Sequence, residues 1–183
     1  MEASYHIHND IVDRCLAGDR TAYEELYRLY EKAMYSISLR ITNDEDDAQD
    51  VLQEAFVSAF QYLNTYNKSA SFGAWLKRIV VNKSINLIKK RKIELTQMTD
   101  DVDLPEEEDE YNSDFSVSQV KQAIKLLPDG YRTIFSLYLL EGYDHREISQ
   151  ILGITESTSK SQFNRSKKKL ITILKQEVVY ERG

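Results

Sequence analysis

The chain has 183 residues, 42% of them hydrophobic and 30% charged, with a formal net charge of −6, and this length suits one compact domain or two small ones. Six glycines and two prolines leave long uninterrupted stretches, which favour helices and exclude a turn-rich β fold. One cysteine rules out an internal disulfide, and the cysteine with three histidines gives no zinc-type spacing, so we expect no metal and no other cofactor. The sequence shows no membrane-length apolar stretch and no signal-peptide pattern in its first ten residues, so we expect a cytoplasmic location.

Charge is distributed in four blocks along the chain. Residues 1–70 carry 13 acidic and 6 basic residues, and residues 71–93 carry 7 basic residues and no acidic ones. Residues 94–118 carry 10 acidic residues and no basic ones, and residues 119–183 carry 11 basic and 7 acidic residues. Two basic blocks separated by an acidic one predict two separate anion-binding surfaces.

The first expected domain, residues 1–93, begins with two predicted helices. A short helix precedes Gly18, and Asp19 is placed to cap a longer one. Apolar residues recur in the longer helix at helical spacing, at Ala22, Leu26, Leu29, Ala33, Ile37 and Ile41. This spacing predicts an amphipathic helix with those residues toward the core.

Two further helices complete this domain. The acidic stretch 43–46 suits the N-terminus of a helix that continues to about Tyr66. After the polar loop 64–71, a fourth helix is expected from about Phe72 to Arg91. Its expected apolar arc contains Phe72, Leu76, Ile79, Val80 and Leu87. Lys83 falls inside this arc, so its side chain must extend to solvent or face a groove.

Residues 94–116 are predicted to form an acidic, flexible linker. The stretch is poor in apolar residues and contains Pro105, so it cannot bury enough surface to offset the entropy of ordering. A solvated acidic helix face is the alternative, which Pro105 opposes. We therefore expect an all-α protein of two small helical domains joined by this linker.

The second expected domain, residues 117–183, ends in a helix-turn-helix pattern. Pro128 suits the first turn of a helix over residues 131–141, which Gly142 ends. Asp144 and Glu147 form a capping-box pair that opens a short helix. Gly153 is expected to close it and Thr155 to cap a last helix that reaches about Gln176. The residues expected to pack inward are Ile148, Ile151, Leu152, Phe163, Ser166, Leu170 and Ile173.

The outer face of the last predicted helix carries hydroxyl, amide and cationic side chains. These are Ser157, Thr158, Lys160, Ser161, Asn164, Arg165 and Lys168. Such groups at the front of a helix can reach base edges and phosphates in a DNA major groove. The pattern therefore predicts a duplex DNA-binding site, and a basic helical hairpin of purely structural use is the alternative.

The first basic block interleaves cations with aromatic residues. Phe72 and Trp75 lie close in sequence to Lys77, Arg78 and Asn82. Aromatic rings next to cations suit single-stranded bases and their phosphates. The alternative for Trp75 is a place in the core.

The order of these features over about residues 10–175 resembles the small two-domain sigma factors of bacterial RNA polymerase, the extracytoplasmic-function (ECF) group of the sigma-70 family. The family's helix that docks on the polymerase β′ subunit is similar to DDAQDVLQEAFVSAF. Its helix for the −10 promoter element is similar to SFGAWLKRIVVNKSINLIKKRK. Its helix-turn-helix for the −35 element is similar to LPDGYRTIFSLYLLEGYDHREISQILGITESTSKSQFNRSKKKL.

The resemblance also implies roles for particular residues. A β′-facing surface would contain Asp47, Asp50, Gln53 and Glu54. Contacts to the −10 element, including a base flipped into the loop 64–71, would come from Asn64, Tyr66, Asn67, Lys68, Phe72, Trp75, Lys77, Arg78 and Asn82. The outer face of the last helix would contact the −35 element. Asn86, Ser159 and Gln162 depart from the family's usual residues.

The resemblance thus implies an initiation factor and not an enzyme. It would bind core RNA polymerase through the β and β′ subunits, recognise promoter DNA in two pieces and assist melting, with no small-molecule substrate. A membrane-linked anti-sigma factor is the regulator that it implies, and the acidic linker would lie in a polymerase channel or serve as a spacer. Two other classes stay open: a helix-turn-helix regulator with a dimerising or sensing N-terminal domain, and a helical adaptor or anti-sigma component.

Overall fold

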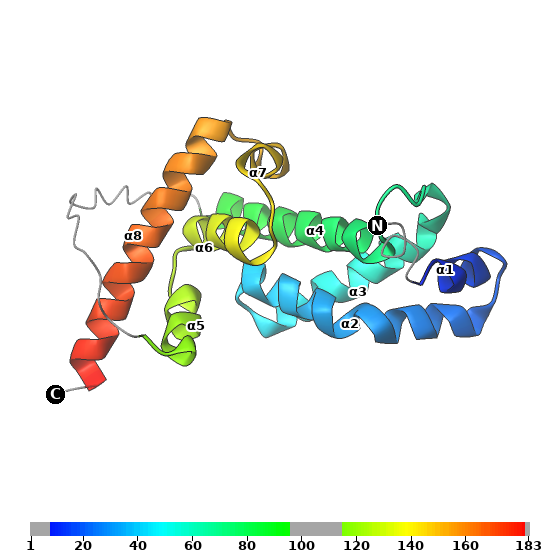
Figure 1. The fold of residues 1–183 in the computed structure, drawn as a ribbon, viewed down its shortest axis with the longest axis horizontal. Helices are drawn as coiled ribbons and strands as arrows, with labels where there is room; N and C mark the ends of the chain where they lie inside the picture. Colours follow the sequence, from blue (N-terminus) through cyan, green and yellow to red (C-terminus); the bar gives the residue numbers. More distant parts are fainter. Residues whose placement is uncertain (1–7, 96–114, 182–183) are drawn as a thin grey trace, which may run out of the picture. The chain divides into compact units, whose positions relative to one another are not determined.

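A computed structural model describes residues 8–95 and 115–181, and these residues are helical with no strand among them (Figure 1). The chain divides into two compact units, Met1–Lys90 and Arg91–Gly183. The all-α class expected from the sequence is confirmed. Most of the predicted linker lies outside the described residues, so its flexibility and the domain limits at 93 and 117 stay predictions. No helix in the described part has the length and apolar character needed to cross a membrane.

The described part of the first unit contains the α-helices α1 (Asn9–Leu16), α2 (Arg20–Thr42) and α3 (Glu45–Gln61) and most of α4 (Phe72–Leu95), whose last five residues lie beyond the limit of the unit at Lys90. The predicted cap of α2 is confirmed, because Asp19 Oδ1 accepts the N–H of Thr21 at 2.9 Å. The N-cap of α3 is Asp44, which accepts the N–H of Asp47 at 2.9 Å. Each of these carboxylates satisfies an amide that the first turn of a helix leaves without an internal partner.

The buried faces of α2 and α4 are rotated from the predicted arcs. Leu29 is 47% exposed and Ala33 is also exposed, whereas Met34 is buried. The ring of Tyr30 packs against Phe72 with centroids 5.3 Å apart. The buried face of α2 is therefore centred about one residue further along the helix than the sequence predicts. In α4, Ile79 and Leu87 are only half-buried, and the core side is completed by Val81, Ser84, Ile85 and Ile88.

Helix α3 ends at Gln61, short of the predicted end near Tyr66. The following 3-10 turn, η1, spans Leu63–Thr65 and buries Leu63. Its amides use shorter-range acceptors, since Thr65 N–H donates to the Tyr62 carbonyl and Tyr66 N–H to the Leu63 carbonyl. The chain therefore leaves the helix axis before the loop 64–71.

The second unit contains α5 (Val117–Lys125), α6 (Asp129–Phe135), the π-helical turn η2 (Ser136–Leu140), α7 (His145–Leu152) and α8 (Glu156–Glu181). Pro128 immediately precedes α6, which begins two residues earlier than predicted. The predicted single helix over 131–141 widens into η2, where the Glu141 N–H donates to the Ser136 carbonyl at 2.9 Å. Gly142, at φ +76, follows this turn.

The helix-turn-helix caps are confirmed. Asp144 accepts the N–H of Glu147 at 2.7 Å, while the Asp144 N–H donates to the Glu147 carboxylate at 2.9 Å. Gly153 adopts the left-handed region at φ +72 and closes α7. Thr155 Oγ1 accepts the N–H of Thr158 at 3.0 Å and so caps α8.

Gly153→Ala is expected to lower the free energy of unfolding by about 1–2 kcal/mol, the cost of a left-handed backbone for a residue with a Cβ. No atom lies within 4 Å of where that Cβ would be, so strain alone sets the cost. Urea unfolding of the full chain followed by helical circular dichroism measures it. Gly130→Ala, in α6 and at no positive φ, is the matched control and should be neutral or stabilising. Equal stability of both variants would contradict the role assigned to Gly153.

Candidate nucleic-acid and polymerase interface

Helix α8 presents the predicted recognition side chains on an exposed face. All seven are exposed: Ser157, Thr158, Lys160, Ser161, Asn164, Arg165 and Lys168. On the opposite side Phe163, Ser166, Leu170 and Ile173 are buried, as the spacing predicts. On α7 the burial is less complete than predicted, because Ile148 is fully buried but the other two inward residues, Ile151 and Leu152, are half-buried. Contact of the exposed face with DNA stays a prediction.

Several of these side chains already have partners near the start of α8. The hydroxyls of Thr155 and Thr158 lie 2.8 Å apart, and Ser161 Oγ donates to the Thr158 carbonyl at 3.0 Å. Lys160 Nζ lies 2.7 Å from Glu156, an ion pair that raises the pKa of Lys160 and lowers the pKa of Glu156. Within the described residues, the side chains of Asn164, Arg165 and Lys168 make no such bond. These three are therefore the side chains most available to a ligand.

A polar contact fixes α8 against α7. Ser159 Oγ is fully buried and lies 2.9 Å from His145 Nδ1. The His145 ring stacks on Tyr138 with centroids 4.4 Å apart and planes 15° apart. This hydrogen bond gives a physical reason for a serine at position 159.

The loop 64–71 exposes some of its predicted contacts and buries others. Asn64, Asn67 and Lys68 are exposed, whereas Tyr66 is 6% exposed. The Tyr66 hydroxyl donates to the Ala70 carbonyl at 2.7 Å, and its ring packs 5.7 Å from that of Phe72. Tyr66 is thus a buried support of the loop and presents no surface to a base in this structure.

Phe72 is also a packing residue, contrary to its predicted place on the strand-binding surface. Its side chain is fully buried, and Tyr30, Tyr66 and Trp75 surround the ring at centroid distances of 5.3 to 5.7 Å. Gly73 allows this packing, because a Cβ there would lie 2.8 Å from the Tyr30 ring. The contacts of these three rings with Phe72 explain why its own ring cannot stack on a base here.

The remaining predicted contacts of α4 form a row along the helix. Arg78 and Asn82 are exposed four residues apart, and Trp75 and Lys77 are half-buried. Asn86 continues the exposed row one turn later. The Trp75 ring lies 5.5 Å from that of Tyr66, so the start of this row adjoins the loop 64–71.

Helix α3 presents the predicted polymerase-facing side chains. Asp50, Gln53 and Glu54 are exposed, and Asp47 is half-buried. Glu54 lies 3.4 Å from Lys83 Nζ, whose side chain is 28% exposed. This ion pair explains how Lys83 is accommodated beside the apolar arc of α4: its stem is covered and its charge meets a carboxylate.

Val57 is a candidate contact that the sequence interpretation missed. It lies one turn beyond Gln53 and Glu54 on the same face of α3, and it is 65% exposed. The available signal was its position off the buried arc of Val51, Leu52, Ala55, Phe56 and Ala59. An exposed apolar side chain beside acidic ones is typical of the centre of a protein-binding surface.

Val57→Asp is expected to weaken binding to core RNA polymerase by about 10-fold, because a charge would replace an apolar contact that loses water on binding. Thermal stability should stay within the small change typical of exposed positions. Fluorescence anisotropy of the labelled full chain against core polymerase measures the affinity. Leu16→Asp, at a 48% exposed apolar residue of α1, is the matched control. Equal loss in both variants would contradict the place of Val57 in this surface.

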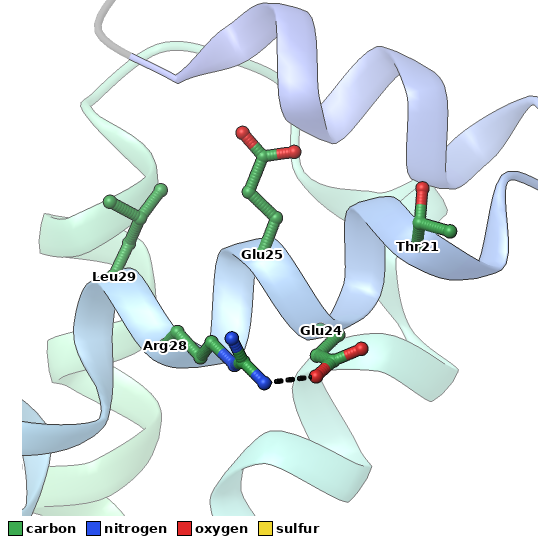
Figure 2. Close-up of a pocket in the computed structure, with 5 residues that line it drawn as sticks. All are labelled: Thr21, Glu24, Glu25, Arg28 and Leu29. Atoms are coloured by element: carbon green, nitrogen blue, oxygen red, sulfur yellow. Dashed lines mark hydrogen bonds and ion pairs between the residues drawn. The ribbon is translucent and has the colours of Figure 1, made fainter.

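A shallow groove on α2 is a further surface feature of the first unit. Figure 2 shows its lining residues, Thr21, Glu24, Glu25, Arg28 and Leu29. Arg28 pairs with Glu24 at 2.5 Å, and Glu25 pairs with Arg14 at 2.8 Å. The Thr21 hydroxyl and Arg14 also donate to Asp19, which lowers the pKa of Asp19 to about 2. The polar groups here therefore bind one another, and no His, Cys, Asp and Glu cluster suited to a metal occurs among the described residues.

Comparisons with known proteins agree with this arrangement. Residues 26–93 match the model of Sigma-70 region 2, and residues 118–170 match that of Sigma-70 region 4. The protein named ECF RNA polymerase sigma factor SigM, from Mycobacterium tuberculosis (strain ATCC 25618 / H37Rv), is 28% identical over 87% of this chain and 80% of its own length. The protein named ECF RNA polymerase sigma factor SigW, from Bacillus subtilis (strain 168), is 29% identical over 84% of this chain and 89% of its own length.

A solved structure shares the fold. The sigma factor RpoE, solved in complex with the anti-sigma factor NepR from Bartonella quintana, aligns with a TM-score of 0.57 at 21% identity. The alignment covers 84% of this chain and 96% of that one. The two matched regions fall in the two helical units, and the two relatives above, which align along most of the chain, are named ECF sigma factors. This chain belongs to the sigma-70 family of RNA polymerase sigma factors, in its extracytoplasmic-function group.

Proposed function

We propose that this protein binds core RNA polymerase through α3 and directs it to promoters by contacting the −35 element with α8 and the −10 element with the loop 64–71 and α4. The observation that carries the proposal is the exposed polar and basic row of α8, held on a capped helix-turn-helix. A sigma factor directs promoter-specific transcription, and the family is one of initiation factors and not of enzymes. We assign this chain no catalytic step of its own.

The −35 element is read as duplex DNA. Arg165 can donate two parallel hydrogen bonds to a guanine edge or to a phosphate, and Asn164 can pair with an adenine edge. Lys168, one turn later, adds a phosphate contact that fixes the register. Lys160 can bind a phosphate only after it breaks its ion pair with Glu156, so it adds less to the free energy of DNA binding.

The −10 element is read as a melted single strand. Extruding a base costs a few kcal/mol of lost stacking, roughly, and the protein must offset it. Asn67 Oδ1 accepts the N–H of Ser69 at 3.0 Å and its hydroxyl at 2.7 Å, so the Asn67 amide nitrogen is the group left to meet a base edge. Arg78 and Asn82 extend the contact along the strand, where the guanidinium attracts phosphates.

Binding to the polymerase uses the acidic face of α3. Asp50 and Glu54 lie on adjacent turns and would meet a basic coiled coil of the β′ subunit. Complementary charge of this kind raises the association rate and fixes the register, and Val57 supplies the apolar contact beside it. The second unit would contact the β subunit while α8 lies on DNA.

Regulation and location follow from these contacts. Because the related RpoE was solved with an anti-sigma factor, we infer that an anti-sigma factor also binds this chain and covers its DNA- or polymerase-binding faces. Because promoter DNA and RNA polymerase lie in the bacterial cytoplasm, we expect this protein to act there.

A DNA-binding comparison separates this function from that of a free helix-turn-helix regulator. Fluorescent promoter fragments are mixed with the full chain alone, with core polymerase alone, and with both. We expect a salt-resistant, sequence-specific complex only when both are present. Specific binding by the free chain as a dimer on a palindromic site would contradict the proposal and favour the regulator.

A further inference from the structure

Helix α1 makes two polar contacts with the loop 64–71. Asp13 Oδ1 lies 2.6 Å from Lys68 Nζ. Asn9 Oδ1 lies 3.1 Å from the Tyr66 hydroxyl oxygen, whose single proton is shared between Asn9 and the nearer Ala70 carbonyl at 2.7 Å. Both contacts join residues more than fifty positions apart in the chain. The matched Sigma-70 region 2 begins only at residue 26, so α1 lies outside it.

We propose that Asn9 and Asp13 are positioning residues for −10 recognition, which hold the loop in the shape that presents Asn67 to a captured base. The proposal rests on the function assigned above to the loop. Neither residue needs to touch DNA, since each acts through its partner in the loop.

Three consecutive loop residues are fixed by three different partners. Tyr66 is held by Asn9, Asn67 by its own turn onto Ser69, and Lys68 by Asp13. The two α1 contacts thus flank Asn67, the side chain proposed above to meet the captured base. A small displacement of Tyr66 or Lys68 would move the Asn67 backbone between them.

The backbone at Lys68 needs such support. Its φ of +60° lies in the left-handed region, which a residue with a Cβ seldom adopts. The ion pair with Asp13 is partly exposed, at 40% for Lys68 and 56% for Asp13, so it adds little to global stability. Its effect is therefore expected to be local, on the conformation of the loop.

The Asn9 contact supports the loop from its buried side. Asn9 is 7% exposed, and the Tyr66 ring that it meets packs on Phe72 and Trp75. Because substitution of this buried residue could disturb the core, Asp13 is the better position for a test. Asp10, on the same helix and exposed, provides a control of equal charge change.

The test measures transcription by core polymerase together with the full chain. Two templates are compared: a promoter that this complex transcribes, and the same promoter with the captured −10 base substituted. We expect Asp13→Asn to lower the ratio of native to substituted transcription by about 2- to 10-fold. The −35 dependence and the melting temperature should not change. Asp13→Glu should restore the ratio, and Asp10→Asn should leave it unchanged. An unchanged ratio in Asp13→Asn would overturn the proposal, even if transcription from both templates fell equally.

Hydrogen exchange of the free chain tests the local part separately. Asp13→Asn should speed amide exchange at residues 66–70 relative to Asp10→Asn, whether or not the chain supports transcription. If exchange is faster in Asp13→Asn but the unsubstituted chain gives no promoter-directed transcript, the proposed function is refuted. The α1 contact is then a support of the loop only, which overturns its role in recognition. Unchanged exchange would overturn the positioning role itself.

Discussion

Arg165→Ala is expected to reduce transcription from a cognate promoter by about 5- to 150-fold, the range for loss of a bidentate arginine contact to a base or phosphate. Arg165 lies on the exposed face of α8, about three turns beyond the Thr155 cap. Its side chain supports no packing, so the fold of the second unit should be unaffected. The loss should be smaller at about 200 mM than at about 50 mM salt, because a complex with one phosphate contact fewer releases fewer counterions and depends less steeply on salt.

The control for this result is Lys121→Ala, which removes the same charge from an exposed position of α5. Multiple-round transcription with core polymerase measures both variants on a promoter with an intact −35 element and on one with that element scrambled. Arg165→Ala should erase the difference between these templates, and Lys121→Ala should preserve it. Unchanged −35 dependence in Arg165→Ala would refute the assignment of α8.

Asp50→Lys is expected to weaken binding to core polymerase by about 100-fold, since the change removes an attraction and places like charges against each other. Asp50 is exposed at the centre of the acidic face of α3, between Asp47 and Glu54. The effect should shrink as salt is raised, because screening weakens both the lost attraction and the new repulsion.

Asp10→Lys provides the same change in net charge on α1 and should bind as the unsubstituted chain does. Anisotropy titration at two salt concentrations measures both. Equal loss in both variants would mean that net charge alone governs the affinity. Normal binding by Asp50→Lys would show that α3 is not the polymerase-facing surface.

Local chemistry explains which parts of the fold the sequence predicts. The caps at Asp19, Asp144 and Thr155 depend on groups within three residues of each other, and each is present as expected. Gly153 ends α7 for an equally local reason, its positive φ. The exposed and buried faces of α8 follow from one helical period, and they also agree with the pattern.

Packing between distant elements explains the misses. Tyr30 packs on Phe72, so the core face of α2 is centred on other residues than predicted. The ring contacts of Phe72 with Tyr66 and Trp75 bury two predicted DNA contacts, Tyr66 and Phe72. The ion pair of Asp13 with Lys68 joins residues 55 positions apart, so no local pattern contains it. The exposure of Val57 likewise depends on which side of α3 its neighbours cover.

Transcription by core RNA polymerase from a library of genomic fragments, with and without this protein, tests the central claim most directly. The account predicts discrete transcripts that appear only with the protein and share paired −35 and −10 elements upstream of their start points. The same transcripts should be lost with Arg165→Ala and with Asp50→Lys. Transcription that shows no promoter-directed product with the unsubstituted protein on any fragment would contradict it.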